Sequence, residues 1–303
     1  MGIKHLIESQ QLDKNIIFEI FRNADKLRTS TKKPLKEKIL ATLFYEPSTR
    51  TRLSFESAML RLGGNVISTE NAKEFSSAVK GESLHDTIRI ISSYADIIVL
   101  RHFKEGSAKI AASVSPVPII NGGDGSGQHP TQALLDLYTI WKEIGKIDNI
   151  TVAMVGDLKY GRTIRSLCYL LGKFENIKII FIAPENLSIK DDIKEYLEKH
   201  NVKFEEQTNL NNFLGYVDIV YMTRIQKERM SDEEYNKSKG KYTITKENLK
   251  LMKENSRLLH PLPHVEEIEL PIDIEQTDKR VAYFRQAENG LYVRMALLDY
   301  LLL

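Results

Sequence analysis

The sequence of 303 residues contains a single cysteine, Cys168. One cysteine cannot form a disulfide within the chain or a cysteine-rich zinc site, which excludes the small secreted domains that disulfides stabilise. No cluster of metal ligands accompanies the motifs described below either. We therefore expect no metal site at these motifs, and a reducing compartment, the cytoplasm.

Long apolar runs and an excess of charge are also missing. No apolar stretch approaches the roughly 18 residues of a membrane span, and the first residues, MGIKHLIESQQ, lack the apolar core of a signal peptide. Lysine and arginine total 43 against 41 for aspartate and glutamate, which leaves a net charge of +2. This balance provides no long-range attraction to nucleic acid or to a membrane surface, so we expect neither as a partner.

What is present is typical of a soluble globular protein. Hydrophobic residues make up 42% of the chain, which is enough to bury sizeable cores. Short apolar runs, among them KILATLFY, NVIS, DIIVLRH and VPIIN, alternate with amphipathic stretches at 51–62 and 84–94 and from Glu105 onward. Runs that are apolar throughout indicate parallel strands covered on both faces, and their alternation with helices indicates an α/β fold.

The alternation restarts in the second half of the chain. The helix HPTQALLDLYTIWKEIG, which ends at Gly145, is followed by ITVAMVGD, NIKIIFIAP, VDIVYMT and RLLHPLP. We predict two doubly wound parallel-sheet domains, 1–144 and 145–285, with the active site in the cleft between them and the terminal helix 286–303 packed back on the first domain. The polar stretch 225–241 is the longest candidate for a mobile loop.

In an open parallel sheet, ligands collect at the carboxyl ends of the strands, and the polar motifs lie there. In EPSTRTRLSFE, Ser48 and Thr49 follow a strand and precede a helix, whose first N–H groups and positive dipole end indicate an anion site. Arg50 is placed to fork onto phosphate oxygens, whereas Arg52 suits a structural ion pair. The alternative is an ordinary helix cap with two solvated arginines.

A second motif, NGGDGSGQHPTQ, places His129, Thr131 and Gln132 after a glycine-rich turn at the start of a helix. Glycine lets the backbone approach a ligand closely. His129 can donate to a carbonyl oxygen, and Gln132 can both donate to and accept from an amide-like group. A purely structural histidine is the alternative. Arg101 ends the preceding apolar run together with His102.

The second half supplies arginines at its strand ends. GDLKYGRT nearly fits a phosphate-binding loop with Arg162 in place of lysine, but Asp157 would repel phosphates and the intervening residues are bulky. Arg162 is therefore interpreted as a clamp for a carboxylate, which matches its planar fork. Arg224 directly follows another apolar run, and a ligand role is favoured for it. In HPLP, the carbonyls of Pro261 and Leu262 are placed to accept from an amine.

Six phrases occur in order over nearly the whole chain: EPSTRTRLSFE, KGESLHDT, HPTQALLDLYTI, GDLKYGRT, YMTRIQKER and HPLP. Together they resemble the aspartate/ornithine carbamoyltransferase family, and within it the catalytic chains that act on aspartate. The ornithine enzymes typically carry cysteine in the segments corresponding to HPTQ and HPLP, and an S-M-G loop. This chain has none of these features.

The resemblance implies transfer of the carbamoyl group of carbamoyl phosphate to the α-amino group of L-aspartate, which gives N-carbamoyl-L-aspartate and phosphate in pyrimidine biosynthesis without a cofactor. It implies that the phosphate is held by Ser48, Thr49, Arg50, Thr51 and Arg101. The carbonyl oxygen would be met by Thr51, Arg101 and His129, and the NH₂ group by Gln132, Pro261 and Leu262. The two carboxylates of aspartate would be bound by Arg162, Arg224 and Gln226. No side chain is an obvious base, so we expect a phosphate oxygen of the substrate to accept the proton.

The resemblance also implies a homotrimer whose active sites are shared between subunits. The segment FSSAVKGES matches the loop that enters the neighbouring site, with Lys80 and Ser76 in the reaching positions. Glu46 would pair with Arg162 and Arg229 to keep the two domains closed. Many relatives bind a separate regulatory chain with zinc and nucleotide sites, and the sequence leaves open whether such a partner exists here.

Three residues depart from the family pattern without replacing a residue assigned to catalysis. His264 stands where arginine is common after HPLP, Phe103 replaces a frequent proline, and Gly127 is expected to loosen the turn before His129. We expect these changes to lower the affinity for aspartate, and His264 to weaken domain closure or make it sensitive to pH. Two alternatives stay open: a carbamoyltransferase for another amine, such as ornithine or a polyamine, and a non-catalytic ligand-binding subunit on the same fold.

Overall fold

The computed structural model of this protein describes residues 2–75, 80–227 and 230–303. Ser76 and Arg229, two residues to which the family resemblance assigns a role, lie outside the described residues. The chain forms two compact units, one of Met1–Leu134 with Glu288–Leu303 and one of Leu135–Ala287. The division between them falls inside a helix, N-terminal to the domain boundary predicted at residue 144.

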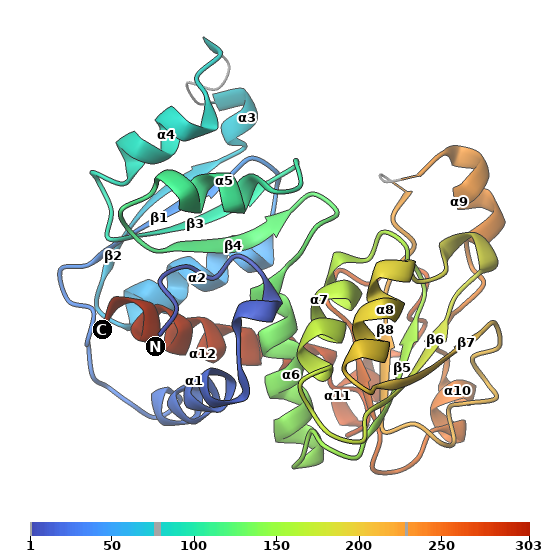
Figure 1. The fold of residues 1–303 in the computed structure, drawn as a ribbon. Coiled ribbons are helices and arrows are strands. Elements are labelled where there is room, and N and C mark those ends of the chain that lie inside the picture. The colour runs from blue at the N-terminus through green and yellow to red at the C-terminus, as the bar shows by residue number, and fades with distance from the viewer. Residues whose placement is uncertain (1, 76–79, 228–229) are drawn as a thin grey trace. The chain divides into compact units, whose positions relative to one another are not determined.

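The first unit is built on a four-stranded parallel sheet with the strand order β2-β1-β3-β4. Its strands are β1 (Ile39–Phe44), β2 (Asn65–Glu70), β3 (Ile97–His102) and β4 (Ile119–Asp124). Figure 1 shows α4 (Leu84–Ile91) and α5 (Ser107–Val114) over one face of this sheet, and α1 (Lys14–Leu27) and α2 (Thr49–Arg61) over the other. The prediction of buried parallel strands is confirmed for β1, β3 and β4, whose residues are nearly all buried. It is wrong for NVIS, because the edge strand β2 has mostly exposed residues and none that is fully buried.

Local hydrogen bonds fix where the helices of this unit begin. The side chains of Asp13 and Ser83 accept backbone N–H groups at the starts of α1 and α4. Residues 288–303, the larger part of α12 (Tyr283–Leu302), group with this unit, and Asn23 of α1 donates to Asp299 at 2.8 Å. The short helices η1 (Ser9–Gln11) and α3 (Ala72–Phe75) also belong to it.

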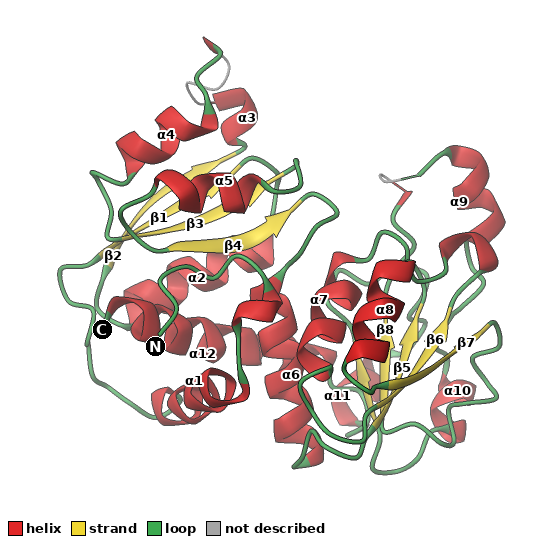
Figure 2. Ribbon diagram, in the orientation of Figure 1, coloured by secondary structure: helices red, strands yellow, loops and turns green. Residues whose placement is uncertain are grey.

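The second unit contains a five-stranded parallel sheet with the order β7-β6-β5-β8-β9. Its strands are β5 (Thr151–Val155), β6 (Lys178–Ile182), β7 (Lys203–Gln207), β8 (Ile219–Met222) and β9 (Arg257–Leu259). Its helices include α6 (Pro130–Ile144, from residue 135 on), α7 (Arg162–Leu171), α8 (Asp191–Lys199), α9 (Asp232–Ser238), α10 (Lys246–Leu251), α11 (Ile272–Thr277) and the short η3 (Glu185–Leu187). Figure 2 shows the sheet with helices on both sides.

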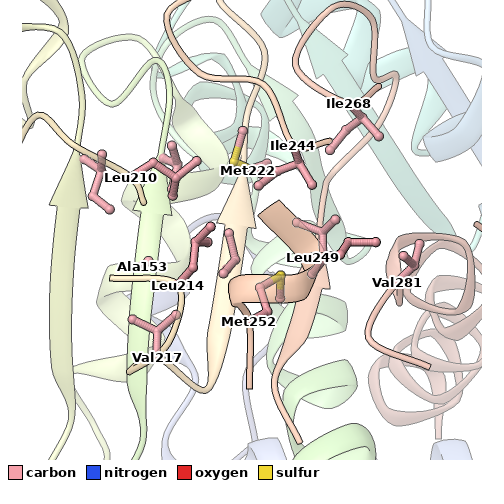
Figure 3. Close-up of a cluster of buried hydrophobic side chains, with 14 of the residues drawn as sticks. Ala153, Leu210, Leu214, Val217, Met222, Ile244, Leu249, Met252, Ile268 and Val281 are labelled. Carbon is pink, nitrogen blue, oxygen red and sulfur yellow. The ribbon is translucent and has the colours of Figure 1, made fainter. Parts of the chain in front are cut away.

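Alternate residues of β5 face two different layers. Ala153 points into the core drawn in Figure 3, together with Met222 of β8 and Leu249 of α10. Met154, the next residue, contacts the thiol of Cys168 in α7 at 3.6 Å on the other face. Burial raises the pKa of that thiol well above its usual range, so Cys168 is a packing residue.

Three segments differ from the pattern read from the sequence. The stretch 225–241 is not one loop, because residues 232–238 form α9, whose start is stabilised by the capping box of Ser231 and Glu234. The glycine-rich segment after VPIIN does not begin as a turn, because β4 continues through Gly122 to Asp124. Strand β7, with the polar sequence KFEEQ, was not predicted, since an edge strand needs no apolar run.

Candidate active site

The carboxyl end of β1 leads directly into α2, and this junction has the features of an anion site. Ser48 is the N-cap residue with an extended backbone, and its side chain makes no capping hydrogen bond within the described structure. The first turn of α2 also contains no acidic residue. It therefore presents the positive end of the helix dipole without a side chain that would neutralise it. Thr49 and Arg50 are exposed there, whereas Thr51 is buried.

Arg52 belongs to the structure of the unit, as predicted. Its Nη2 lies 2.7 Å from Glu70 Oε2 at the end of β2, and its Nη1 lies 3.3 Å from Glu56 Oε1 one turn later on α2. These two ion pairs connect the helix start to the neighbouring strand. The prediction of a structural ion pair for Arg52 is confirmed, and Arg50 is the arginine of this motif that stays exposed.

Arg101 reaches the same edge of the sheet from β3, which lies between β1 and β4. Its Nη1 donates to the carbonyl of Gly122 at 3.3 Å, and its Nε lies 3.7 Å from Glu46 Oε2. Glu46 thus contacts Arg101 within the first unit. Its implied partners were Arg162, which belongs to the second unit, and Arg229, which lies outside the described residues, so that pairing stays a prediction.

Thr51 and His129 are brought together although 78 residues separate them. The Thr51 hydroxyl lies 3.4 Å from His129 Nε2, and the Thr131 hydroxyl lies 3.4 Å from His129 Nδ1. His129 follows β4 and is buried, and Gln132 occupies the first turn of α6. Groups that can donate to an anion and to a carbonyl oxygen therefore gather at the carboxyl edge of the first sheet.

Asp124, to which the sequence analysis gave no role, organises the segment that leads to His129. This buried carboxylate accepts from the Gln128 N–H at 3.1 Å through Oδ1 and from the Gly106 N–H at 3.0 Å through Oδ2. The Asn121 amide also donates to it, at 3.1 Å. A signal for this role is present in the sequence: an aspartate among glycines commonly binds neighbouring backbone N–H groups.

Gly127 does not loosen this segment, contrary to our expectation. A Cβ atom at residue 127 would lie 2.9 Å from Asp124 Oδ1 and 3.0 Å from Glu105 Cγ. The glycine is needed because the backbone packs closely against these two side chains. Gly127 therefore allows close packing of the backbone before His129.

His102 is structural. Its Nδ1 accepts from the Lys104 N–H at 3.0 Å and lies 2.9 Å from the Ser107 hydroxyl. Burial lowers the pKa of His102, although the nearby charges of Glu46 and Asp124 act in the opposite direction. Phe103 is 47% exposed and stacks on this imidazole with ring centres 4.3 Å apart.

In the second unit, the predicted ligand residues follow three adjacent parallel strands. Arg162 is the first residue of α7 after β5, Arg224 and Gln226 follow β8, and HPLP follows β9. Because the carboxyl ends of parallel strands meet at one edge, these segments lie side by side. Arg162 is buried, with 9% of the residue exposed.

Asp157 connects two of these segments. It is fully buried, its Oδ1 accepts from the Tyr160 N–H at 2.9 Å, and its Oδ2 accepts from the Gln226 side-chain amide at 3.4 Å. The strands approach closely here, since a Cβ atom on Gly156 would lie 2.2 Å from the carbonyl of Thr223. Asp157 therefore orders the loops around Arg162 and Gln226, a positive role that the sequence analysis missed.

The HPLP segment is fixed by His260, whose Nδ1 accepts from the Leu262 N–H at 2.8 Å. Further along, His264 Nε2 lies 3.4 Å from Glu275 Oε1, and Glu275 also accepts from the Tyr283 hydroxyl. The His264 ring meets that of Tyr283 edge to face. These contacts of His264 all lie within the second unit.

Lys80 is exposed, which is compatible with a residue that reaches another subunit. In the described ranges, no group of three or more histidine, cysteine, aspartate or glutamate side chains is arranged to bind a metal ion. Within the same ranges, no helix has the length and apolar character needed to cross a bilayer.

Two family models match the chain over almost its full length. "Aspartate/ornithine carbamoyltransferase, carbamoyl-P binding domain" matches residues 4–142, and "Aspartate/ornithine carbamoyltransferase, Asp/Orn binding domain" matches residues 148–301. The chain belongs to the aspartate/ornithine carbamoyltransferase family. The resemblance inferred from the six motifs is thereby confirmed, and so is the α/β fold with two parallel sheets.

Relatives within the family match nearly the whole of this chain. The aspartate carbamoyltransferase catalytic subunit of Methanocaldococcus jannaschii is 53% identical, and the match covers 99% of this chain and 98% of that subunit. Aspartate carbamoyltransferase 1, chloroplastic, of Pisum sativum is 54% identical over 98% of this chain and 78% of its own. The structure of the M. jannaschii catalytic subunit superposes with a TM-score of 0.89 at 52% identity, over 99% of this chain and 98% of that one.

A structure with a bound bisubstrate compound is also similar. Aspartate transcarbamoylase from Trypanosoma cruzi, in complex with N-(phosphonacetyl)-L-aspartic acid, superposes with a TM-score of 0.92 at 37% identity. It covers 100% of this chain and 96% of its own. The same enzyme has been solved with carbamoyl phosphate and aspartate.

Proposed function

We propose that this chain is the enzyme that transfers the carbamoyl group of carbamoyl phosphate to the α-amino group of L-aspartate, giving N-carbamoyl-L-aspartate and phosphate in de novo pyrimidine biosynthesis. The observation that carries the proposal is the gathering of the α2 start, Arg101, and the Thr51 and His129 pair at the carboxyl edge of one sheet. Donors for a phosphate lie there beside donors for a carbonyl oxygen. The substrates bound by the T. cruzi relative support the choice.

In this proposal the first domain, residues 1–144 with the terminal helix 286–303, binds carbamoyl phosphate. Its phosphate is bound by Ser48, Thr49, Arg50, Thr51 and Arg101. Thr51, Arg101 and His129 donate to the carbonyl oxygen, which gains negative charge as the amine attacks the carbon. A donor aimed at such developing charge typically contributes about 3 kcal/mol to transition-state stabilisation.

The second domain, residues 145–285, binds aspartate. Arg162, Arg224 and Gln226 receive its two carboxylates, since guanidinium groups match carboxylates with two parallel hydrogen bonds. Asp157 keeps the Gln226 amide in place, because it accepts one of that amide's protons. Two arginines favour a dianionic acceptor over ornithine, whose side chain is cationic.

The carbamoyl NH₂ group is held by Gln132 and by the carbonyls of Pro261 and Leu262. We assign no side chain as the base that removes the proton of the attacking amine. A phosphate oxygen of the substrate accepts it, and the enzyme acts by positioning the reactants and stabilising charge. The active site lies in the cleft between the two domains, and Glu46 pairs with Arg162 and Arg229 when they close.

The assembly that we propose is a homotrimer in which Lys80 and Ser76 of one subunit complete the site of the next. Its compartment in this proposal is the cytoplasm, where a single buried thiol stays reduced. Light scattering on the purified chain measures the subunit number. The same measurement after co-purification detects a regulatory chain, if one binds.

The activity is tested by colorimetric assay of N-carbamoyl-aspartate, with L-ornithine as the competing acceptor. We expect turnover with aspartate only. Calorimetric titration with N-(phosphonacetyl)-L-aspartic acid should show one tight site per chain. Arg50→Ala and Arg224→Ala should each weaken that binding at least about a hundredfold, because each leaves a charged group of the ligand without its partner.

Two matched controls separate these roles from a general loss of positive charge. Arg61→Ala removes an exposed arginine from the other end of α2, and Lys227→Ala removes an exposed lysine three residues after Arg224. Both variants should bind the compound like the unchanged chain. Turnover with ornithine but not aspartate, or no turnover with either, would overturn the proposal.

A further inference from the structure

The second unit contains a buried chain of hydrogen bonds that the proposed mechanism does not use. Its members are Tyr221 of β8, Asp136 of α6, Gln286 of α12 and His260, which follows β9. None of them is more than 2% exposed. This series of hydrogen bonds ends at the backbone N–H of Leu262, within the HPLP segment.

The direction of each hydrogen bond follows from chemistry. The Tyr221 hydroxyl donates to Asp136 Oδ2 at 2.7 Å, and the Gln286 amide donates to Asp136 Oδ1 at 2.6 Å. The His260 backbone N–H donates to Gln286 Oε1 at 2.8 Å. A backbone N–H can only donate, so Gln286 must present its oxygen to His260 and its NH₂ group to Asp136.

The same reasoning assigns the protons of the His260 ring. Its Nδ1 accepts from the Leu262 N–H at 2.8 Å and therefore carries no proton. Its Nε2 lies 2.9 Å from Glu267 Oε1. Burial acts to raise the pKa of Glu267, but its interaction with His260 lowers it below its usual range. The imidazole thus accepts a hydrogen bond from Leu262 on one side and lies against the Glu267 carboxylate on the other.

Every donor between Leu262 and Asp136 points toward the Asp136 carboxylate. Hydrogen bonds aligned in this way polarise one another, and the effect is strongest where water is excluded. Burial, together with the charge of Asp136, raises the pKa of Tyr221 well above its usual range, so Tyr221 remains a donor. Buried charged groups are often replaceable by apolar packing without loss of stability, so a buried carboxylate with this many partners is weak evidence for a purely stabilising role.

The last hydrogen bond of the series is made by a peptide group that has a role in the proposed mechanism. The Leu262 N–H and the Pro261 carbonyl belong to the same peptide plane, and in a trans peptide they point in opposite directions. The bond from the Leu262 N–H to His260 therefore fixes where the Pro261 carbonyl points. Leu262 itself has a φ of 56°, a conformation that leucine rarely adopts and that needs such support.

We propose that His260 is a positioning residue for the carbamoyl group. Through Nδ1 it orients and polarises the peptide between Pro261 and Leu262, so that the Pro261 carbonyl accepts a hydrogen bond from the carbamoyl NH₂. Gln286 and Asp136 keep His260 in the position that this role requires. The inference rests on the proposed function, in which the Pro261 carbonyl binds that NH₂ group.

The role predicts that His260 controls recognition of an NH₂ group and not of the phosphate. Two stable probes separate these contributions: phosphonoacetamide, which carries the NH₂ group, and acetonylphosphonate, which carries a methyl group in its place. Both are titrated calorimetrically into the full chain. The ratio of their dissociation constants measures what the NH₂ group contributes.

The unchanged chain should prefer phosphonoacetamide. His260→Leu removes the acceptor and should reduce this preference about tenfold, by weakening the amide only, since one hydrogen bond is lost. His260→Asn, whose side-chain oxygen can replace Nδ1 as acceptor, should retain most of the preference. His264→Leu, on the same segment but without a bond to Leu262, should leave it unchanged.

Three outcomes decide the matter. If His260→Leu weakens both probes equally, or leaves the preference intact, His260 has no positioning role. If the unchanged chain binds both probes alike, the assignment of the Pro261 carbonyl fails, and this inference fails with it. If His260→Leu does not fold, Gln286→Met is used instead, because it removes the acceptor of the His260 N–H. This variant should also reduce the preference for phosphonoacetamide over acetonylphosphonate. An unchanged preference would overturn the inference.

Discussion

At the residue scale, the chemistry of the first unit depends on how His129 carries its proton. The Thr131 hydroxyl lies beside Nδ1 and the Thr51 hydroxyl beside Nε2, both at 3.4 Å. If Thr131 donates to Nδ1, Nε2 carries the proton and can donate to the substrate's carbonyl oxygen. A neutral donor of this kind stabilises an oxyanion without acting as a base.

His129→Ala should therefore lower kcat about 100-fold to 1000-fold, which is the usual effect of losing one oxyanion donor. The kcat of His129→Gln, whose amide can still donate, should lie between those of the unchanged enzyme and His129→Ala. Steady-state kinetics across the pH range provide the check. Because no enzyme base is assigned, the pH profile of His129→Ala should keep the shape of the unchanged enzyme. A loss of activity at low pH that is present in the unchanged enzyme and disappears in this variant would reveal a base and contradict the mechanism.

Residue types and their spacing indicated which residues are candidates to bind the substrates, such as Arg50 after a strand or Arg162 at a helix start, and those roles stay predictions. They did not indicate the residues that order the segments around these candidates. Asp124, Asp157 and His260 act on segments that only the folded sheet brings together. A hydrogen bond between distant loops leaves no periodic signal in a sequence, so these roles required the structure.

At the scale of elements, apolar runs predicted the central strands, because a strand covered on both faces must be apolar throughout. The exceptions have local causes. The edge strand β7 is polar, and α9 is a short helix whose start is fixed by a capping box. The sequence SDEE at 231–234 fits the capping-box pattern, so α9 was recognisable in principle.

One ion-pair cluster ties three elements of the second unit together. Glu143 of α6 accepts from Arg257 of β9 at 2.8 Å and from Arg285 of α12 at 2.7 Å. Burial acts to raise the pKa of Glu143, but the hydrogen bonds and charges of the two arginines outweigh it and lower the pKa. A lowered pKa in the folded state means that ionised Glu143 stabilises the fold.

Glu143→Gln should reduce the free energy of unfolding by about 1–3 kcal/mol at pH 7, the range for hydrogen bonds to charged groups. This contribution is present above the ordinary carboxyl pKa of 4.5 and is lost as the pH falls through the lower folded value. Urea unfolding of both proteins between pH 7 and pH 3 tests this. The difference should shrink with acidification, and a constant difference would show that charge is not its source. Glu195→Gln, on α8 and without an ion pair in the described structure, is the control.

At the scale of the whole molecule, length and the repeated alternation predicted two α/β units. The compact units divide within α6, at residues 134 and 135, whereas the sequence marks only the end of this helix, at Gly145. A continuous helix that belongs to both units has no compositional break. The residues proposed to bind the substrates are likewise distributed, with those for the phosphate in the first unit and the arginines for the two carboxylates in the second.

The proposed assembly adds a third contributor to each site, and this can be tested with two inactive variants. If Lys80 acts in the site of a neighbouring subunit, a Lys80→Ala chain supplies an intact His129 and a His129→Ala chain supplies an intact Lys80. Co-expressed in equal amounts, the two chains should assemble into trimers at random, and about one quarter of all sites should then combine both intact residues. We expect about that share of the activity of the unchanged enzyme, far above either variant alone. If Lys80 served its own chain, every site would lack one residue, and mixing would restore nothing.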